Sequence, residues 1–100
     1  MFVHHVFFWL KNPNNATDQA ALIAGLEKLK AAPPIGTAYI GLPADTNRSV
    51  IDNSYAVSWL LLFDNAANQA AYQTDSIHLQ FVEECASLWE RVLVYDSVNI

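Results

Sequence analysis

Two segments of this 100-residue chain are apolar on both faces of the strands that they predict, and this feature restricts the fold most. Residues 2–10 and 54–64 are rich in β-branched and aromatic side chains, which favours β-strands. One face of the first strand carries Val6, Phe8 and Leu10, and its other face carries Phe7 and Trp9. One face of the second strand carries Val57, Trp59, Leu61 and Phe63, and its other face carries Leu60 and Leu62. An antiparallel strand with one face in water alternates apolar and polar residues. We therefore expect both faces to be buried.

The remaining segments place these strands in a β-α-β-β-α-β order. Leu22, Leu26 and Leu29 recur at helical spacing. This helix begins at an N-cap, either Asn15 or Thr17, and ends at Pro33-Pro34. A short helix or turn is expected over 65–72 and a long helix from Asp75 or Ser76 to about Trp89. A weaker strand is expected over 35–42, a polar loop over 43–53 and a strand rich in Val and Tyr over 91–98. This order predicts a ferredoxin-like α+β fold with a four-stranded antiparallel sheet. Right-handed crossovers place both helices on one face of the sheet.

The other face of that sheet has no helix from the same chain to cover it. Hydrophobic residues make up 53% of the chain and charged residues 15%, against roughly 45–50% and 25% in typical domains. Each buried Leu or Phe contributes about 1.5–3 kcal/mol, and a bare apolar face invites aggregation. We therefore expect two sheets to pack face to face as a homodimeric α+β barrel. An exposed patch or a different partner is the alternative.

Charge and composition exclude several classes of function. Five Lys and Arg against ten Asp and Glu give a net charge of −5, which argues against binding nucleic acid or an anionic membrane. No apolar run reaches the roughly 18 residues of a membrane span, and the N-terminus lacks the basic region of a signal peptide. No glycine-rich phosphate loop is present. We expect a single domain over residues 1–100, located in the cytoplasm.

His78 is the most informative candidate for chemistry. It begins an expected buried stripe on its helix that continues with Phe81, Val82, Cys85 and Trp89. Burial and a helix N-terminus both lower the pKa of an imidazole, which favours a neutral base. Tyr72, six residues earlier, can donate a hydrogen bond to a substrate oxygen. The alternative is purely structural: His78 braces the helix start and Tyr72 packs on a rim.

His4 and His5 are adjacent on a predicted strand, so their side chains point to opposite faces. They cannot readily bind one metal ion together, and no zinc-binding spacing is present. Cys85, the only cysteine, excludes an intrachain disulfide and is expected to be an inert core thiol. We therefore expect neither a metal nor a cofactor.

Three stretches resemble the stress-responsive A/B barrel (Dabb) family over residues 2–98. They are His4-His5-Val6-Phe7-Phe8-Trp9-Leu10-Lys11, the stretch with Phe63-Asp64, Ala71-Tyr72-Gln73-Thr74 and His78-Leu79-x-Phe81-Val82, and Val92-Leu93-Val94-Tyr95-Asp96. The resemblance implies a dimeric α+β barrel. Some members are polyketide cyclases that close a ring by intramolecular aldol chemistry without metal or organic cofactor.

In those cyclases a histidine at the start of the second long helix acts as base beside a tyrosine, and His78 and Tyr72 match these positions. A first-strand histidine lines the pocket. Matching the lysine at the strand end selects His4, whereas counting from the N-terminus selects His5. Ser76 stands where the family often has proline.

Three functions follow from these residues and this resemblance. The first is a barrel that binds a small apolar or aromatic molecule and acts as a cofactor-free cyclase or lyase. Its catalytic residues would be His78 and Tyr72, and its pocket would be lined by His4 or His5, Phe8, Trp59, Phe81 and Val82. The second is a non-enzymatic, stress-associated dimeric barrel. The third is a cofactor-free monooxygenase or isomerase, which rests on fold analogy alone.

Overall fold

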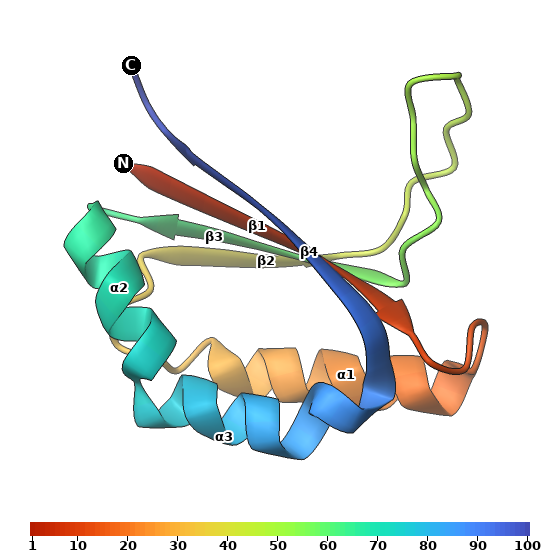
Figure 1. The fold of residues 1–100 in the computed structure, drawn as a ribbon, viewed down its shortest axis with the longest axis horizontal. Coiled ribbons are helices and arrows are strands. Elements are labelled where there is room, and N and C mark those ends of the chain that lie inside the picture. Colours follow the sequence, from red (N-terminus) through yellow and green to blue (C-terminus); the bar gives the residue numbers. More distant parts are fainter.

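The computed structural model describes all 100 residues and has the predicted order of elements (Figure 1). They are β1 (Phe2–Leu10), α1 (Ala16–Leu29), β2 (Thr37–Gly41), β3 (Val57–Phe63), α2 (Ala66–Thr74), α3 (Ser76–Cys85), a 3₁₀ turn η1 (Ala86–Leu88) and β4 (Trp89–Val98). The strands form one sheet in the order β2-β3-β1-β4, and every neighbouring pair is antiparallel. This confirms the ferredoxin-like α+β fold.

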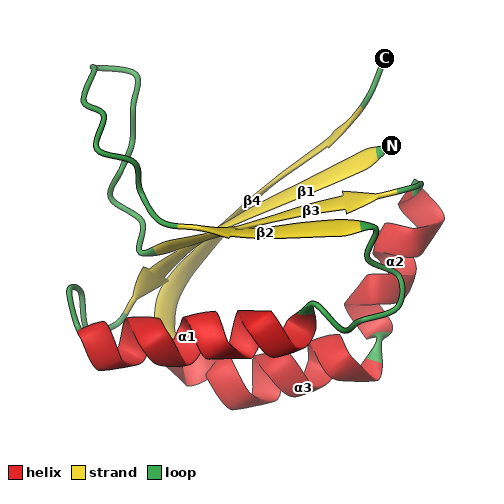
Figure 2. Cartoon of the chain, turned by 180° about the vertical axis from the view of Figure 1, so that it is seen from behind, coloured by secondary structure: helices red, strands yellow, loops and turns green.

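All helices lie on one side of the sheet (Figures 1 and 2). The helix side of β1 and β3 is buried and carries His4, Val6, Phe8, Leu10, Val57, Trp59, Leu61 and Phe63. The side away from the helices, here called the open face, has no helix packed over it, and the loop residues Ser54 and Tyr55 contact it at Trp9 and Phe7. It carries the half-buried side chains of Val3, His5, Phe7, Trp9, Leu60 and Leu62, with exposed Tyr39 and Tyr95. A single copy thus buries only one of the two apolar faces.

The helices begin at side-chain caps that the sequence predicts. The Asn15 side chain accepts a hydrogen bond from the Asp18 backbone N–H at 3.0 Å, and the Asp75 carboxylate accepts one from the Ile77 N–H at 2.9 Å. Such caps satisfy N–H groups that have no partner within the helix. The leucine stripe of α1 is fully buried. None of the helices has the length and apolar character that a membrane span requires.

The expected long helix to Trp89 is wrong, because α3 ends at Cys85 and Trp89 begins β4. Phe81 and Cys85 are buried, whereas Val82 is 38% exposed. Trp89 still packs on this cluster, with its ring 5.7 Å from that of Phe81. After the 3₁₀ turn, the half-buried Trp89 packs against the core although it lies outside the helix. Its position in the sequence therefore looks like a continuation of the helical spacing.

The other predicted boundaries shift by a few residues. The short helix α2 extends to Thr74, β2 is confined to Thr37–Gly41, and β3 begins at Val57 rather than at residue 54. The loop expected over 43–53 is therefore longer and covers residues 42–56.

Helices α1 and α3 approach closely at Gly25. A Cβ atom at this position would lie 2.5 Å from the Cys85 Sγ and 3.4 Å from the Phe81 ring. Alanine normally stabilises a helix by about 1 kcal/mol relative to glycine, but overpacking a core costs about 1–3 kcal/mol. We expect Gly25→Ala to lower the free energy of unfolding by about 1 kcal/mol.

The matched background is Cys85→Ala, which removes the obstructing sulfur. There Gly25→Ala is expected to become neutral or stabilising in urea denaturation, and the double-mutant cycle measures the coupling. Equal destabilisation in both backgrounds would show that the Gly25–Cys85 contact is not the cause.

Candidate functional site

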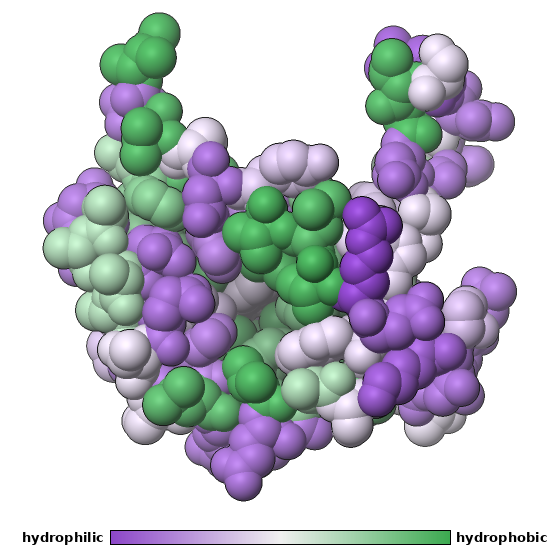
Figure 3. Space-filling model, viewed as in Figure 1, coloured by the Kyte–Doolittle hydropathy of each residue, from purple (hydrophilic) through white to green (hydrophobic).

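A cavity of about 180 Å³ lies between the sheet and helices α2 and α3. It is lined by His4, Val6, Phe8, Trp59, Tyr72, Gln73, His78, Phe81, Val82, Trp89, Val92 and Val94. Figure 3 shows apolar surface over β4 beside a recess between the sheet and the helices. The lining is mainly hydrophobic, so its few polar groups determine what chemistry the cavity can support.

Tyr72 lies near the end of α2 and is only 2% exposed. Its hydroxyl oxygen accepts a hydrogen bond from the Trp59 Nε1–H at 3.2 Å. This bond leaves the hydroxyl proton of Tyr72 free to be donated elsewhere. Burial raises the pKa of Tyr72 to about 12, opposed in part by the Trp59 hydrogen bond. The phenol therefore stays protonated at neutral pH and acts as a hydrogen-bond donor.

His78 lies in the first turn of α3, with its ring 4.5 Å from that of Tyr72. Its Nδ1 is 3.2 Å from the Gln73 backbone carbonyl oxygen. Because a carbonyl can only accept, Nδ1 carries the proton and Nε2 keeps the free lone pair of the neutral ring. Burial lowers the pKa of His78, as does the nearby His4, whereas the Gln73 carbonyl and Asp75 raise it. Burial is the largest effect, which favours a neutral imidazole that can accept a proton.

His4 enters the same cavity from β1 and is 7% exposed. Its Nδ1 is 2.6 Å from a carboxylate oxygen of Asp96, the residue opposite it on β4. Because a carboxylate only accepts, Nδ1 donates to Asp96 and the ring is held in this orientation. Nε2 is then the nitrogen of His4 that can contact a ligand. The His4 ring lies 6.1 Å from that of Tyr72.

His5 points to the open face, where it lies opposite Leu60 on β3 and Tyr95 on β4. Its ring packs 4.3 Å from that of Phe7, and it does not line the cavity. Of the two histidines that the sequence left as alternatives, His4 lines the cavity and His5 does not.

The structure brings seven of the eight predicted site residues into one cavity: His4, Phe8, Trp59, Tyr72, His78, Phe81 and Val82. Sequence reasoning missed the Asp96 carboxylate that holds His4 and the Gln73 carbonyl that orients His78. It also missed Val92 and Val94 of β4, which line the cavity. Their only signal is the pairing register of β1 and β4, which periodicity alone does not supply.

Comparison with known proteins identifies the family of this chain. The profile of the Dabb family, the Stress responsive A/B Barrel Domain, matches residues 2–99. The chain belongs to the Dabb family. No curated protein matches it in sequence.

Solved structures share the fold of this Dabb chain at low sequence identity. A Dabb family protein with a ferredoxin-like fold from Mesorhizobium loti is 21% identical, with a TM-score of 0.80 over 99% of this chain and 96% of that one. A dimeric ferredoxin-like protein of unknown function from Thermobifida fusca is 16% identical, with a TM-score of 0.77 over 98% and 90%. A hydroxynitrile lyase from Passiflora edulis is 20% identical, with a TM-score of 0.77 over 98% and 93%.

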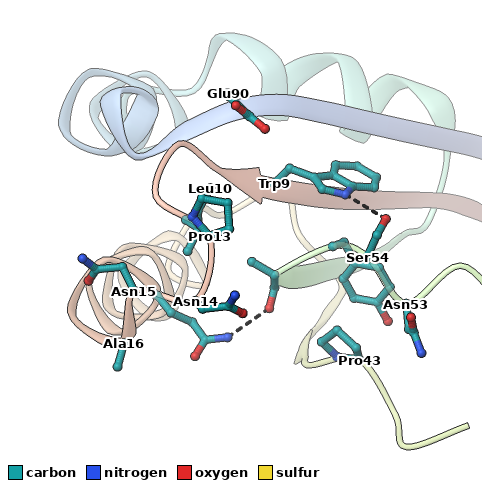
Figure 4. Close-up of a pocket in the computed structure, with 13 residues that line it drawn as sticks. Trp9, Leu10, Pro13, Asn14, Asn15, Ala16, Pro43, Asn53, Ser54 and Glu90 are labelled. Carbon is teal, nitrogen blue, oxygen red and sulfur yellow. Dashed lines mark hydrogen bonds between the residues drawn. The ribbon is translucent and has the colours of Figure 1, made fainter.

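A larger recess of about 600 Å³ lies beside the C-terminal end of β1 (Figure 4). Its walls include several asparagines and two prolines, and Trp9 and Gln19 donate hydrogen bonds to Ser54 and to the Ala56 carbonyl there. It contains no histidine and a single carboxyl group, that of Glu90. No hydrogen bond joins this carboxylate to a proton donor, unlike the contact of His78 with Tyr72 in the smaller cavity. The smaller cavity is therefore the candidate site of this Dabb chain, although the recess is more spacious.

The burial of His78 makes the stability of the fold depend on pH. Its folded-state pKa lies below the ordinary value of 6.5, so the unfolded chain binds a proton first as the pH falls. The stabilisation is complete above about pH 6.5 and is lost as the pH drops from there through the folded pKa.

We expect a lower free energy of unfolding at pH 5 than at pH 7.5 in urea titrations, and a smaller difference in His78→Gln. Burial also lowers the pKa of His5, so part of the dependence should remain. An identical dependence in the variant would contradict this assignment.

Proposed function

We propose that this Dabb chain binds a small aromatic molecule carrying a hydroxyl or carbonyl group and catalyses proton transfer at that group. His78 acts as the general base and Tyr72 as the hydrogen-bond donor. The observation that carries this proposal is the meeting of Tyr72, His78 and His4 in a mainly apolar cavity.

The size of the cavity supports one aromatic ring with small substituents. An apolar protein cavity of roughly 150 Å³ accommodates benzene, and the cavity here measures about 180 Å³. Phe8, Trp59 and Phe81 supply apolar walls for such a ring. The polar atoms of the ligand would then lie against the tyrosine and the histidines.

The proposed chemistry uses the two protonation states described above. In a cyanohydrin, the free Nε2 of His78 removes the hydroxyl proton, the O–H electrons form the carbonyl, and the C–CN electron pair leaves with cyanide. The proton then passes from His78 to cyanide, giving hydrogen cyanide. Tyr72 donates a hydrogen bond to the oxygen while it carries negative charge. The neighbour from Passiflora edulis, named a hydroxynitrile lyase, supports this reaction class.

We also propose that two copies pair through their open faces. The half-buried Phe7, Trp9 and Leu60 on that face support a homodimer, as does the Thermobifida fusca neighbour, which is named a dimeric protein. A role in stress response and the cytoplasmic location stay predictions.

Binding is tested with acetophenone and ethylbenzene, two probes of similar shape of which only the first has a carbonyl oxygen. We expect both to shift the amide NMR signals around Phe81 and His78. Tyr72→Phe should weaken acetophenone binding about 3- to 10-fold, the value of one hydrogen bond, and leave ethylbenzene binding unchanged. Shifts confined to the recess near Asn53 would contradict the proposed site.

A further inference from the structure

The loop over residues 42–56, here called the arm, rises from the sheet on the side away from the helices (Figures 1 and 2). Gly41 and Ser58 are paired neighbours at the ends of β2 and β3. Hairpin loops commonly need only 2–5 residues, and structureless loops longer than about 12–15 residues are usually functional or disordered. The length of the arm therefore exceeds what the connection requires.

Hydrogen bonds within the arm hold its shape. The Ile51 N–H donates to the Arg48 carbonyl at 2.9 Å, the Asn53 side chain donates to the Thr46 carbonyl at 3.2 Å, and the Ser54 N–H donates to the Asp52 carboxylate at 2.9 Å. The arm is thus a formed structure even though it contains neither helix nor strand.

The base of the arm is anchored to the open face. The Trp9 Nε1–H donates to the Ser54 hydroxyl at 3.0 Å (Figure 4), and the Tyr55 ring lies 5.0 Å from that of Phe7. The arm and the open face therefore form one continuous surface. A partner that covers Phe7 and Trp9 also meets the arm.

The arm presents apolar side chains that its own chain leaves bare. Val50 is 83% exposed and Leu42 is 55% exposed. Apolar surface on a shaped segment beside a larger apolar face is typical of an interaction site.

The area of the open face supports a role for the arm in pairing. With a rise of about 3.3 Å per residue and a strand spacing of about 4.8 Å, the four strands cover roughly 500 Å² in projection. A standard interface buries about 800 Å² of accessible surface on each partner. Accessible area exceeds projected area, and the arm, which contacts the open face at Trp9 and Phe7, adds further accessible surface on the same side of the molecule.

We infer that the arm clasps a second copy of this chain, with Val50 packed against the partner. This inference rests on the proposed homodimer. In a two-fold dimer both arms contribute, so every substitution in the arm acts twice in one interface.

The test is the dimer dissociation constant from sedimentation equilibrium. In one variant Asn-Gly replaces residues 43–53, and in a second Val50 becomes aspartate. The control is Leu79→Asp, at a site on α3 that is also exposed, at 55%. We expect both arm variants to raise the dissociation constant at least tenfold while circular dichroism shows an intact fold, and the control to match the unaltered chain.

Two negative results are distinguishable. Arm variants that dimerise as tightly as the unaltered chain overturn the inference about the arm and leave the homodimer standing. An unaltered chain that stays monomeric at tens of micromolar overturns the homodimer itself, and the arm with it.

Discussion

Replacing His78 by alanine is expected to lower the proposed cleavage of mandelonitrile by a factor of about 10²–10⁴, which is the usual contribution of a general base. The variant removes Nε2, the nitrogen that keeps a free lone pair because Nδ1 donates to the Gln73 carbonyl. Mandelonitrile is a cyanohydrin with one aromatic ring and one hydroxyl, as the proposed function requires. The measurement is the absorbance of the benzaldehyde released, after subtraction of the spontaneous reaction.

The matched control is His78→Gln. Its amide can still donate a hydrogen bond to the Gln73 carbonyl, but it cannot take up a proton in this pH range. We expect His78→Gln to retain the fold, as judged by circular dichroism, and to be about as inactive as His78→Ala. If the glutamine variant cleaved mandelonitrile at the rate of the unaltered chain, His78 would be a structural residue and not the base.

Replacing Leu60 by aspartate is expected to convert the proposed homodimer into monomers. Leu60 lies within the open face, between His5 on β1 and Tyr39 on β2. Each leucine withdrawn from an interface costs about 1.5–3 kcal/mol, and two-fold symmetry doubles the effect. The dissociation constant should therefore rise by about 10²–10⁴, and the burial of two carboxylates should raise it further.

Sedimentation equilibrium measures this change, with Leu79→Asp on the exposed side of α3 again as the control. Leu60 is partly exposed in a single copy, so the substitution leaves the core between the sheet and the helices intact. A dimer of unchanged affinity in Leu60→Asp would show that the copies pair through another surface.

The fold was predictable because local pattern and global topology agree. The apolar runs of β1 and β3, the leucine stripe of α1 and the caps at Asn15 and Asp75 are all local signals. The end of α3 was not predictable in this way. Trp89 continues the helical spacing of Phe81 and Cys85 although it belongs to β4. Helix geometry places Phe81 and Cys85 on one side of α3, whereas Trp89 joins them by packing from β4.

The candidate site was predictable only in part. Resemblance to the Dabb family selected His78 and Tyr72, and the structure places them in contact across one cavity. The partners that set their protonation were not predictable, since the Gln73 carbonyl is a backbone group and carries no residue-specific signal. Trp59, expected only as a wall, also supplies the hydrogen bond that directs the Tyr72 proton.

The sequence by itself determined that the sheet is apolar on both sides and that His4 and His5 face opposite ways, because side chains alternate along every strand. Only the tertiary structure decided which histidine shares the cavity with Tyr72. The helices cover one side of the sheet, and that side holds His4 paired to Asp96, a residue 92 positions away along the chain. Contacts across such distances depend on strand register and helix packing, which no local pattern encodes.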